Sequence, residues 1–396
     1  MSDVGPPSLS WQVLGPGDPW LHDYYKLYRP AVFAEESHPL KVLVLLGSAD
    51  ISGGSYVIFQ HALYWQRHGA DVTIATLMSR ASLLSHWHPA LDELAITTID
   101  ELGDEVYDVA VATWWRTVYE LPAVRTRHAL YFVQSIESRF YVEGDDTYAA
   151  PLAELTYRYD LPVVTITHWI QAYLAFEHGR PSFLVRNGID KDRYSPFGLT
   201  VEPRRRGRLR VLVEGPPEVT MKNIPASVEL ARAGGADEVW LMTPSDVKTF
   251  PGVDRVLSRV DIDRTGAVYR SCDVLVKLSR VEGMYGPPLE MFHCGGTVVT
   301  YDVTGHEEYV VNDVNGLVVP MEHTQGVVAA IRKLKEDPNT LQRLKHGALS
   351  TAERWPDWET TCAEFWSIIR LVAQRPAPDK LLSMLAIRGA GITGNR

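Results

Sequence analysis

Two glutamates separated by seven residues are the first feature of this sequence that indicates chemistry. Glu282 and Glu290 lie in the stretch SRVEGMYGPPLEMFHCGG, which covers residues 279–296. Pro287 and Pro288 fit the first positions of a helix, where a missing N–H costs nothing. The run CDVLVKLS before them is typical of a buried strand. We therefore expect Glu282 on the loop at the carboxyl end of a strand and Glu290 in the first turn of the following helix.

A helix that begins at such an edge suits an anionic group, because its free N–H groups and its dipole point toward the ligand. Ligands of open α/β sheets bind at this same edge. Carboxylates cannot neutralise phosphate, but they accept hydrogen bonds from sugar and ribose hydroxyls. The arrangement therefore predicts a nucleotide-sugar site. A plainer alternative stays open, in which Glu290 only complements the helix dipole and Glu282 is a solvated loop residue.

The segments before this stretch predict a parallel sheet. The continuous apolar run at 41–46 is typical of a strand buried on both faces. A helical pattern follows and ends at Gly69, and a second strand at 72–75 completes a βαβ unit. Further strands are expected at 109–112, 129–133 and 163–166, separated by connections long enough for helices.

The Pro- and Arg-rich stretch VEPRRRGRLR at 201–210 interrupts this pattern, and we place a domain boundary there. The pattern then begins again, with strands expected in LRVLVEG, EVWLMTP, DVLVKLS, TVVTYD and GLVVP. Two such series predict an α/β fold with two Rossmann-like, doubly wound parallel-sheet domains that face a cleft. The expected units are an N-terminal extension at 1–39, a first domain at 40–200, a second domain at 201–356, a helix at 357–376 that crosses back to the first domain, and a tail at 377–396.

The composition is that of an ordinary globular protein, with 45% hydrophobic and 22% charged residues. A length of 396 residues predicts two domains. Charge is unevenly distributed, because residues 1–185 carry 11 Lys/Arg against 22 Asp/Glu while the rest of the chain is close to neutral. The acidic first half disfavours nucleic acid and anionic lipid as partners.

The cysteines and the apolar runs bear on the compartment. Cys272, Cys294 and Cys362 are scattered and have no CxxC spacing, which favours a reducing compartment over a disulfide framework or structural zinc. No apolar run approaches the ~20 residues that a membrane helix needs. The first residues lack the basic and apolar regions of a signal peptide. We therefore expect a cytoplasmic protein without an integral membrane segment.

Several stretches together resemble one family. EGMYGPPLEMFHCG at 282–295 resembles the E-x7-E motif of the family-four retaining glycosyltransferases, which have the GT-B fold. The glycine pair at 53–54, VRNGIDKDRYSP at 185–196 and VTGHEEYVVNDVNGLVVP at 303–320 resemble other stretches of that family, in the family's order. The resemblance covers most of residues 40–360. It depends on the matching stretches occurring together in the family's order, and not on any single stretch.

This resemblance implies a role for each residue of the motif. Glu282 would bond a hydroxyl of the donor sugar, Glu290 would bond the ribose, and the amides that follow Glu282 would meet the diphosphate. Lys222 matches a lysine that grips the leaving diphosphate. The expected catalytic residues are Glu282 and Lys222, and the expected donor-binding residues are Glu290, Gly283, Met284, Tyr285, Gly286, Gly53, Gly54 and Lys277.

One position departs from the family's pattern. The family carries an arginine six residues before the lysine, where this sequence has Pro216. The loss of one guanidinium would remove about 3 kcal/mol of charge stabilisation. Lys277, Arg280 or Arg193 are candidates to supply the missing charge, and low or absent activity is the alternative.

The acceptor side is expected on the first domain. The glycines at 53–54 allow a close approach of backbone to phosphate or acceptor, or form an ordinary βα turn. YFVQSIESRFY at 131–141 resembles a Gln-x-x-Glu stretch of rhamnosyltransferase-like relatives, which makes Gln134 and Glu137 acceptor-side candidates. His168, at the end of a further strand, is the third candidate, with a packing histidine as the plainer alternative.

The sequence thus leads to the hypothesis of a metal-independent, retaining glycosyltransferase. It would move a sugar from a nucleotide-diphosphate-sugar on the second domain to a hydroxyl of a glycan, lipid-linked or small-molecule acceptor, with no further cofactor. A diphosphate leaves without protonation once its charge is neutralised, so no protein nucleophile is required. Two alternatives stay open. One is a GT-B-fold UDP-sugar epimerase or inverting transferase, which would need a general acid or base; the other is a catalytically silent nucleotide-sugar-binding protein.

Four other signals are assigned no function. DID at 261–263 is expected in a solvated loop, and HWH at 86–88 lacks the ligand spacing of a metal site. The arginines of 204–210 coincide with the linker and stand alone, so they do not predict nucleic-acid binding. GSADISGG is not a GxGxxG motif.

Overall fold

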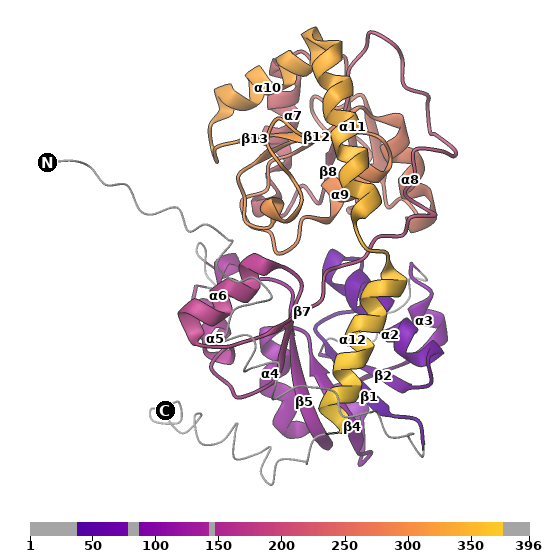
Figure 1. Cartoon of the computed structure of the whole chain (residues 1–396), viewed down its shortest axis with the longest axis vertical. Helices are drawn as coiled ribbons and strands as arrows, with labels where there is room; N and C mark the ends of the chain where they lie inside the picture. The colour runs from indigo at the N-terminus through magenta and orange to yellow at the C-terminus, as the bar shows by residue number, and fades with distance from the viewer. Residues whose placement is uncertain (1–37, 78–86, 142–146, 375–396) are drawn as a thin grey trace, which may run out of the picture.

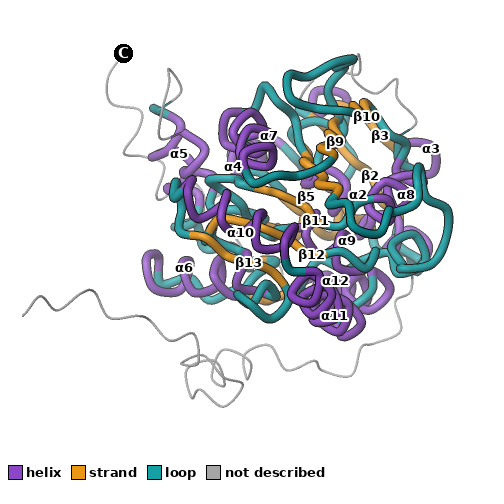
Figure 2. Tube along the Cα trace, turned by 90° about the horizontal axis from the view of Figure 1, so that it is seen from above, coloured by secondary structure: helices purple, strands orange, loops and turns teal. Residues whose placement is uncertain are grey.

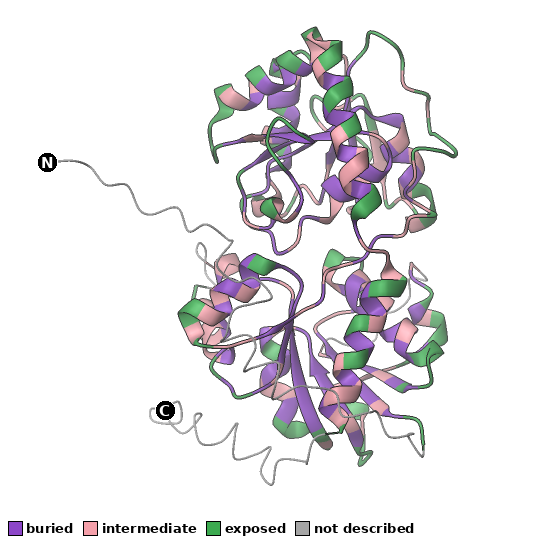
Figure 3. Cartoon of the chain, viewed as in Figure 1, coloured by how far each residue is buried: buried purple, intermediate pink, exposed green. Residues whose placement is uncertain are grey.

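The computed structural model describes residues 38–77, 87–141 and 147–374, which form two α/β halves stacked along the long axis of the molecule (Figure 1). Seen from above, the strands lie in the middle of the molecule and the helices surround them (Figure 2). The strands are the most buried part of each half, and exposed residues gather on the outer faces of the helices (Figure 3). This is the arrangement that two doubly wound sheets require.

The first half contains a seven-stranded parallel sheet with the order β3-β2-β1-β4-β5-β6-β7. Its strands are β1 (Lys41–Leu46), β2 (Asp71–Thr76), β3 (Ala95–Thr98), β4 (Tyr107–Ala112), β5 (Thr126–Val133), β6 (Val163–Thr165) and β7 (Phe183–Leu184). Its α-helices are α2 (Gly53–Arg67), α3 (Ala90–Glu93), α4 (Trp115–Glu120), α5 (Ala149–Thr156) and α6 (His168–His178). β1 pairs with β2 on one side and β4 on the other, which explains why its run is apolar on both faces.

The second half contains a six-stranded parallel sheet with the order β10-β9-β8-β11-β12-β13. Its strands are β8 (Arg210–Glu214), β9 (Glu238–Thr243), β10 (Arg255–Ser258), β11 (Val274–Lys277), β12 (Thr297–Tyr301) and β13 (Gly316–Val319). Its α-helices are α7 (Ile224–Ala233), α8 (Ile262–Ser271), α9 (Gly286–His293), α10 (Thr324–Glu336) and α11 (Pro338–Arg354). Successive residues of β8 face opposite layers: Val211 packs in the cluster of α7 and α10, whereas Leu212 packs in that of α8 and α9.

The helix α12 (Trp358–Ala373) follows the second half in sequence but packs on the first half. It runs along α2, as the yellow helix of Figure 1 shows. Phe365 and Ile369 are fully buried in the core of the first sheet. Burial of each such side chain stabilises the fold by roughly 2 kcal/mol. The core of the first half is therefore completed by a helix that follows the second half in the sequence.

The α/β class with two parallel sheets is confirmed, but some elements differ from the expectations. β3, β7 and β10 were not predicted, because each is an outermost strand of its sheet, has at most four residues and is only partly buried. The glycines at 53–54 begin α2, with Ser52 as its N-cap, and do not belong to the preceding loop. The domain limits stay a proposal; the first sheet ends at Leu184 and the second begins at Arg210.

No helix in the described part of the chain is both long enough and apolar enough to cross a membrane.

Candidate active site at the meeting of the two sheets

The two halves touch where β5 and β6 end and where β11 leads into α9. Gly283, directly after Glu282, lies against the backbone of Gln134, and a Cβ at position 283 would overlap the Gln134 carbonyl oxygen. The indole Nε1 of Trp169 donates a hydrogen bond of 2.7 Å to the carbonyl of Gly283. Only glycine permits this approach of two backbones. The carboxyl ends of the strands of the first sheet therefore face the motif that contains Glu282.

A second contact between the halves joins Glu308 to the start of α6. One carboxylate oxygen of Glu308 accepts from the backbone N–H of His168 at 2.6 Å, and the other lies 3.0 Å from the His168 Nδ1. The Glu308 side chain is only 3% exposed, so this carboxylate satisfies a free N–H at a helix start contributed by the other half. His168 is an exposed residue that faces Glu308.

Glu282 and Lys222 form an ion pair on the second half. The Lys222 Nζ, at the end of a short 3₁₀ turn after β8, lies 2.8 Å from Glu282 Oε1. Burial disfavours the charge of Glu282, but Lys222 and Lys277 outweigh it and hold the pKa of that carboxyl below its ordinary value. The carboxylate is nearly buried, whereas 29% of the Lys222 side chain remains exposed. Glu282 is thus ionised and aimed at the lysine that the resemblance placed at the leaving group.

Lys277 lies beneath this pair, at the end of β11. Its ammonium is 2.5 Å from Glu214 Oε2 and 3.2 Å from the Glu214 carbonyl oxygen. Burial opposes its charge, but the carboxylates of Glu214, Glu282 and Glu290 together keep the pKa of Lys277 above its ordinary value. Lys277 therefore neutralises carboxylates from inside the protein, with its side chain only 3% exposed.

Glu290 lies on α9 just past its first turn, one residue further into the helix than expected, because α9 begins at Gly286. Burial raises the pKa of Glu290 to about 7; Glu214 acts in the same direction, and hydrogen bonding with Tyr269 and Tyr194 acts against it. The side chain is half-buried. This carboxyl can therefore exchange a proton near neutral pH, and its contact with a ribose hydroxyl stays a prediction.

The residues between the two glutamates have different surroundings. Tyr285 is fully buried, and its hydroxyl donates to the carbonyl of Lys277 at 2.7 Å. Met284 is half-buried and packs against the cores of both halves. Gly286 has open space where a Cβ would lie. The side chain of Tyr285 thus holds the loop on β11, and the contact of this loop's amides with a diphosphate stays a prediction.

The expected acceptor side lies across from this loop. The Gln134 side chain donates to the carbonyl of Gly54 at 3.4 Å, so the glycine pair and the end of β5 are neighbours. Glu137 is 7% exposed, and its carboxylate accepts from the backbone N–H of Trp115 at 2.8 Å. Burial raises the pKa of Glu137 to about 8. This geometry favours a positioning role for Glu137, and its direct contact with an acceptor stays a prediction.

The three candidates to replace the missing guanidinium all form ion pairs within the protein. Arg280 lies 2.6 Å from Glu322, and Arg193 lies 2.8 Å from Asp263. Lys277 is held by Glu214 as described above. Within the residues that the structure describes, Lys222 is therefore the part-exposed cation that directly faces Glu282.

Two of the discounted signals have clear structural roles, and one expectation was wrong. DID does not lie in a loop: Asp261 occupies the N-cap position of α8 without a side-chain cap hydrogen bond, and Asp263 lies in the first turn, paired with Arg193. No group of three potential metal-ligating side chains occurs in the described ranges. In the linker, Arg204 donates to the carbonyls of Gly295 and Cys294, and Arg210 pairs with Glu238. His86 lies outside the described residues.

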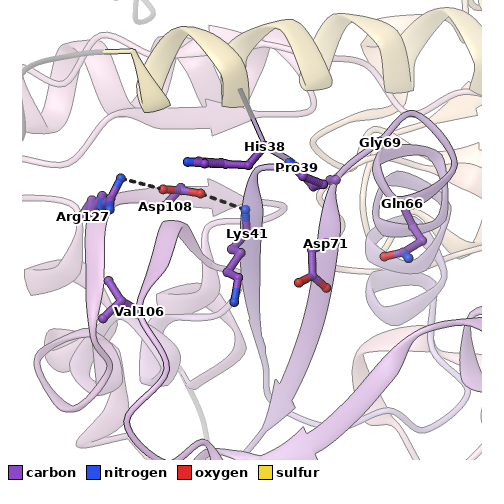
Figure 4. Close-up of a pocket in the computed structure, with 10 residues that line it drawn as sticks. His38, Pro39, Lys41, Gln66, Gly69, Asp71, Val106, Asp108 and Arg127 are labelled. Carbon is purple, nitrogen blue, oxygen red and sulfur yellow. Dashed lines mark hydrogen bonds and ion pairs between the residues drawn. The ribbon is translucent and has the colours of Figure 1, made fainter. Parts of the chain in front are cut away.

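A separate pocket of about 590 Å³ lies at the opposite, amino-terminal edge of the first sheet (Figure 4). Two of its cations are paired: Arg127 pairs with Asp108, and Lys41 pairs with the neighbouring Glu105. The Lys41 amide also donates to Asp108. Asp71 also lines this pocket, which lies at the sheet edge opposite to the one that faces the Glu282 loop.

Several residues of the site were not predicted from the sequence. Glu214 ends β8 and could have been noticed because strand ends form ligand edges. Glu308 lies inside the quoted stretch 303–320, but its partner is in the other half. Trp169 adjoins the predicted His168, and nothing in the sequence indicated its bond to Gly283.

Comparisons with known proteins agree with this geometry. Residues 254–350, which include both glutamates, match the family model of group 1 glycosyl transferases. The chain is 27% identical over 267 residues to the O-antigen biosynthesis protein RfbC of Myxococcus xanthus, an alignment that covers 64% of this chain and 20% of RfbC. The chain thus spans about a fifth of the length of that relative.

Solved structures resemble almost the whole described chain. Sucrose-phosphate synthase from Thermosynechococcus elongatus superposes with a TM-score of 0.66 at 14% identity, covering 83% of this chain and 98% of that chain. Anabaena HepE, solved with UDP-glucose, superposes with a TM-score of 0.65 at 17% identity, covering 83% of this chain and 100% of that chain. At these identities the likeness establishes the fold. The protein has the GT-B fold, and its residues 254–350 match the family model of the group 1 glycosyl transferases.

Proposed function

We propose that this protein is a retaining glycosyltransferase that moves a sugar from a nucleotide-diphosphate-sugar to a hydroxyl acceptor. The observation that carries the proposal is the Lys222–Glu282 pair, 2.8 Å apart at the carboxyl edge of the second sheet and facing the first half. The match of residues 254–350 to group 1 glycosyltransferases supports it. The HepE structure with UDP-glucose supports a UDP-sugar as the donor class.

The proposed roles follow from charge. Glu282 accepts a hydrogen bond from a donor-sugar hydroxyl, and Glu290 accepts from the ribose. As the bond between the anomeric carbon and the diphosphate breaks, Lys222 and the amides at the start of α9 stabilise the charge that develops on the leaving oxygen. The acceptor hydroxyl attacks on the same face of the sugar, and its proton passes to the departing diphosphate. No protein nucleophile takes part.

The Lys222–Glu282 pair also has a ground-state role. Without donor, the Glu282 carboxylate is paired with the ammonium of Lys222. When a diphosphate arrives, it competes for that ammonium, while a sugar hydroxyl takes up the freed carboxylate oxygen. Donor binding therefore exchanges one charge-assisted contact for two, which ties the position of the sugar to that of the diphosphate.

The other proposed properties rest on less direct support. The acceptor binds on the first half, near Gln134 and the glycines of α2. A cytoplasmic location is proposed because Cys272, Cys294 and Cys362 are buried free thiols. Rhamnosyl specificity rests only on the likeness of the stretch at 131–141.

A second candidate is a nucleotide-sugar-binding protein without turnover. It is favoured by Pro216 together with the engagement of Lys277, Arg280 and Arg193 in ion pairs. In this case the donor would bind, but the leaving diphosphate would lack a second cation.

Two measurements test the proposal. Thermal stabilisation by UDP, GDP and dTDP, and by their sugar conjugates, identifies the nucleotide, because a ligand of the native state raises the melting temperature. Release of the nucleoside diphosphate from the stabilising donor, followed by NMR of the anomeric centre of the product, then identifies the reaction. Retention of configuration is expected. Inversion or epimerisation would replace the proposal by the inverting or epimerase alternative, and binding without turnover would support the silent protein.

A further inference from the structure

Two arginines on the first half are held by aromatic rings instead of carboxylates. The guanidinium carbon of Arg116 lies 5.1 Å from the ring centre of Trp114 and 5.0 Å from that of Trp115. That of Arg139 lies 5.1 Å from the Trp169 ring and 5.4 Å from the Tyr173 ring. Neither arginine forms an ion pair with any residue that the structure describes. Among the described residues, therefore, no carboxylate neutralises either guanidinium, whose donors can serve a ligand.

This arrangement is unusual for this half, which is rich in acid. Arg67, Arg125, Arg127 and Arg180 each pair with a carboxylate of Glu93, Asp104, Asp108 and Asp160, respectively. Arg125 and Arg127 lie at the amino-terminal edge of the sheet, next to the start of β5. Arg116 and Arg139 instead follow the carboxyl ends of β4 and β5, the edge that faces the second half.

The two arginines come from segments that are fixed to each other. The Glu137 carboxylate accepts from the Trp115 amide at 2.8 Å, and the Trp115 Nε1 donates to the Tyr141 hydroxyl at 3.0 Å. These bonds join the start of α4 to the 3₁₀ turn Glu137–Tyr141. Gln134, which contacts Gly283, lies just before that turn. The arginine-bearing segments therefore adjoin the contact that carries Glu282.

Trp114 provides a flat surface at the same edge. Its side chain is half-buried and packs over Gly47 at the end of β1, where an added Cβ would lie 2.8 Å from Trp114 Cε3. Aromatic rings at such edges stack on sugar rings, while guanidinium groups bind phosphate and carboxylate through paired donors. A sugar that carries an anionic group matches both features.

We propose that Arg116, Arg139 and Trp114 form an acceptor subsite for a saccharide that carries a phosphate or carboxylate group. The inference rests on the proposed glycosyltransferase function and adds the class of its acceptor. The anionic group can belong to a soluble sugar phosphate or uronate, or to a sugar joined to a lipid through a diphosphate. The subsite places the anion on the first half, and so leaves Lys222 to the donor.

Binding to the purified full-length protein tests this, with tryptophan fluorescence as the readout. The probes are glucose, glucose 6-phosphate, glucuronate and N-acetylglucosamine linked by a diphosphate to a farnesyl chain. The wild type is expected to bind at least one anionic probe on the order of tenfold more tightly than glucose. Preference for the soluble or the lipid-linked probes identifies the source of the anion, and either supports the proposal.

Variants assign that preference to the two arginines. Arg116→Gln combined with Arg139→Gln should reduce the ratio of anionic-probe affinity to glucose affinity to about one. Arg125→Gln, in an exposed ion pair at the other edge of the sheet, should leave this ratio unchanged. Arg139→Lys retains the charge and should keep part of the preference, which covers the case in which the glutamine variant folds poorly. The proposal is overturned if glucose binds as well as the anionic probes, if no anionic probe binds, or if the double glutamine variant keeps the preference.

The affinity of the nucleoside diphosphate, measured on the same samples, separates this inference from the proposed function. It should stay within about twofold in every arginine variant, because the arginines lie on the half opposite to Lys222. An arginine-dependent preference in a protein that binds no nucleotide would sustain the anion subsite and refute the glycosyltransferase proposal.

Discussion

The ammonium of Lys222 lies 2.8 Å from the Glu282 carboxylate, at the edge of the second sheet that faces the first half. Sixty residues separate the two in sequence, and β8 and β11, which are neighbours in the sheet, bring them together. Lys222 lies on the 3₁₀ turn that follows β8, and Glu282 lies on the loop that follows β11. Lys222 helps to hold the pKa of Glu282 below its ordinary value. Four predictions start from this and related contacts.

Lys222→Ala is expected to lower kcat by about 10²- to 10³-fold and donor affinity much less, because the lysine acts mainly on charge that develops during bond cleavage. The substitution also removes the cation that holds the pKa of Glu282 down. The acid limb of the kcat–pH profile should therefore move to higher pH. Lys333→Ala, in an exposed ion pair on α10, is the matched control. Equal losses in kcat and donor affinity would contradict the leaving-group role.

Donor affinity should depend on pH through Glu290. Its pKa is raised to about 7, and ribose hydroxyls would donate to the ionised form. Binding then releases a proton, so affinity for the nucleotide-sugar should rise by about tenfold from pH 6 to pH 8. A nucleotide-sugar is the suitable ligand, because its diphosphate does not titrate in this window.

Calorimetry of Glu290→Gln checks this assignment. The variant should bind the donor about tenfold more weakly than the wild type at pH 8, with affinity that no longer changes with pH. An E290Q protein with the wild-type pH profile would show that another group titrates.

Gly283→Ala should disturb the meeting of the two halves. The added methyl overlaps the Gln134 carbonyl oxygen, so the halves must move apart. We expect a larger radius of gyration in small-angle scattering and at least a tenfold loss of turnover, since small displacements misalign the reacting groups. Gly286→Ala meets no atom within 4 Å and serves as the control for the scattering measurement, in which it should match the wild type. If G283A turned over at the wild-type rate, this contact would have no role in the reaction.

Stability in acid should depend on His61. Its ring is buried among Trp65, Phe132 and Phe365, and neither ring nitrogen has a hydrogen-bond partner among the described residues. Burial lowers the pKa of His61 to about 3, so only the unfolded chain takes up its proton between pH 6.5 and pH 3. Stability is therefore lost as the pH falls through that window.

Urea unfolding of His61→Leu measures this loss. Relative to the wild type, the variant should gain about 2 kcal/mol between pH 7 and pH 5. His68→Leu, at the exposed C-cap position of the helix that contains His61, is the control. A constant difference between H61L and the wild type across this range would mean that His61 becomes charged inside the fold.

The parallel sheets could be predicted because buried strands such as Lys41–Leu46 and Val274–Lys277 are continuous apolar runs. Short strands at or near a sheet edge, such as Arg255–Ser258, have no such run and were missed. Glu290 lies just past the first turn and not within it, because the helix begins one residue earlier, at Gly286, and sequence patterns define helix starts only loosely.

The residues of the candidate site also fall into two groups, those that the sequence indicated and those that only the fold brings together. Glu282, Glu290 and Lys222 could be proposed because each lies in a recognisable local pattern. The bonds of Trp169 to Gly283 and of Glu308 to the start of α6 join residues more than 110 positions apart, and no local pattern records such a pairing. Glu137 was found by its spacing, but only the fold reveals that it is buried against the Trp115 amide.

The packing of α12 on α2 has a consequence for synthesis on the ribosome. Phe365 and Ile369 belong to the first core, yet they are translated after all six strands of the second sheet. While the second half emerges and folds, the nascent first half must keep an apolar face open beside α2. A chaperone that covers this face during elongation would protect the chain until the closing helix leaves the exit tunnel.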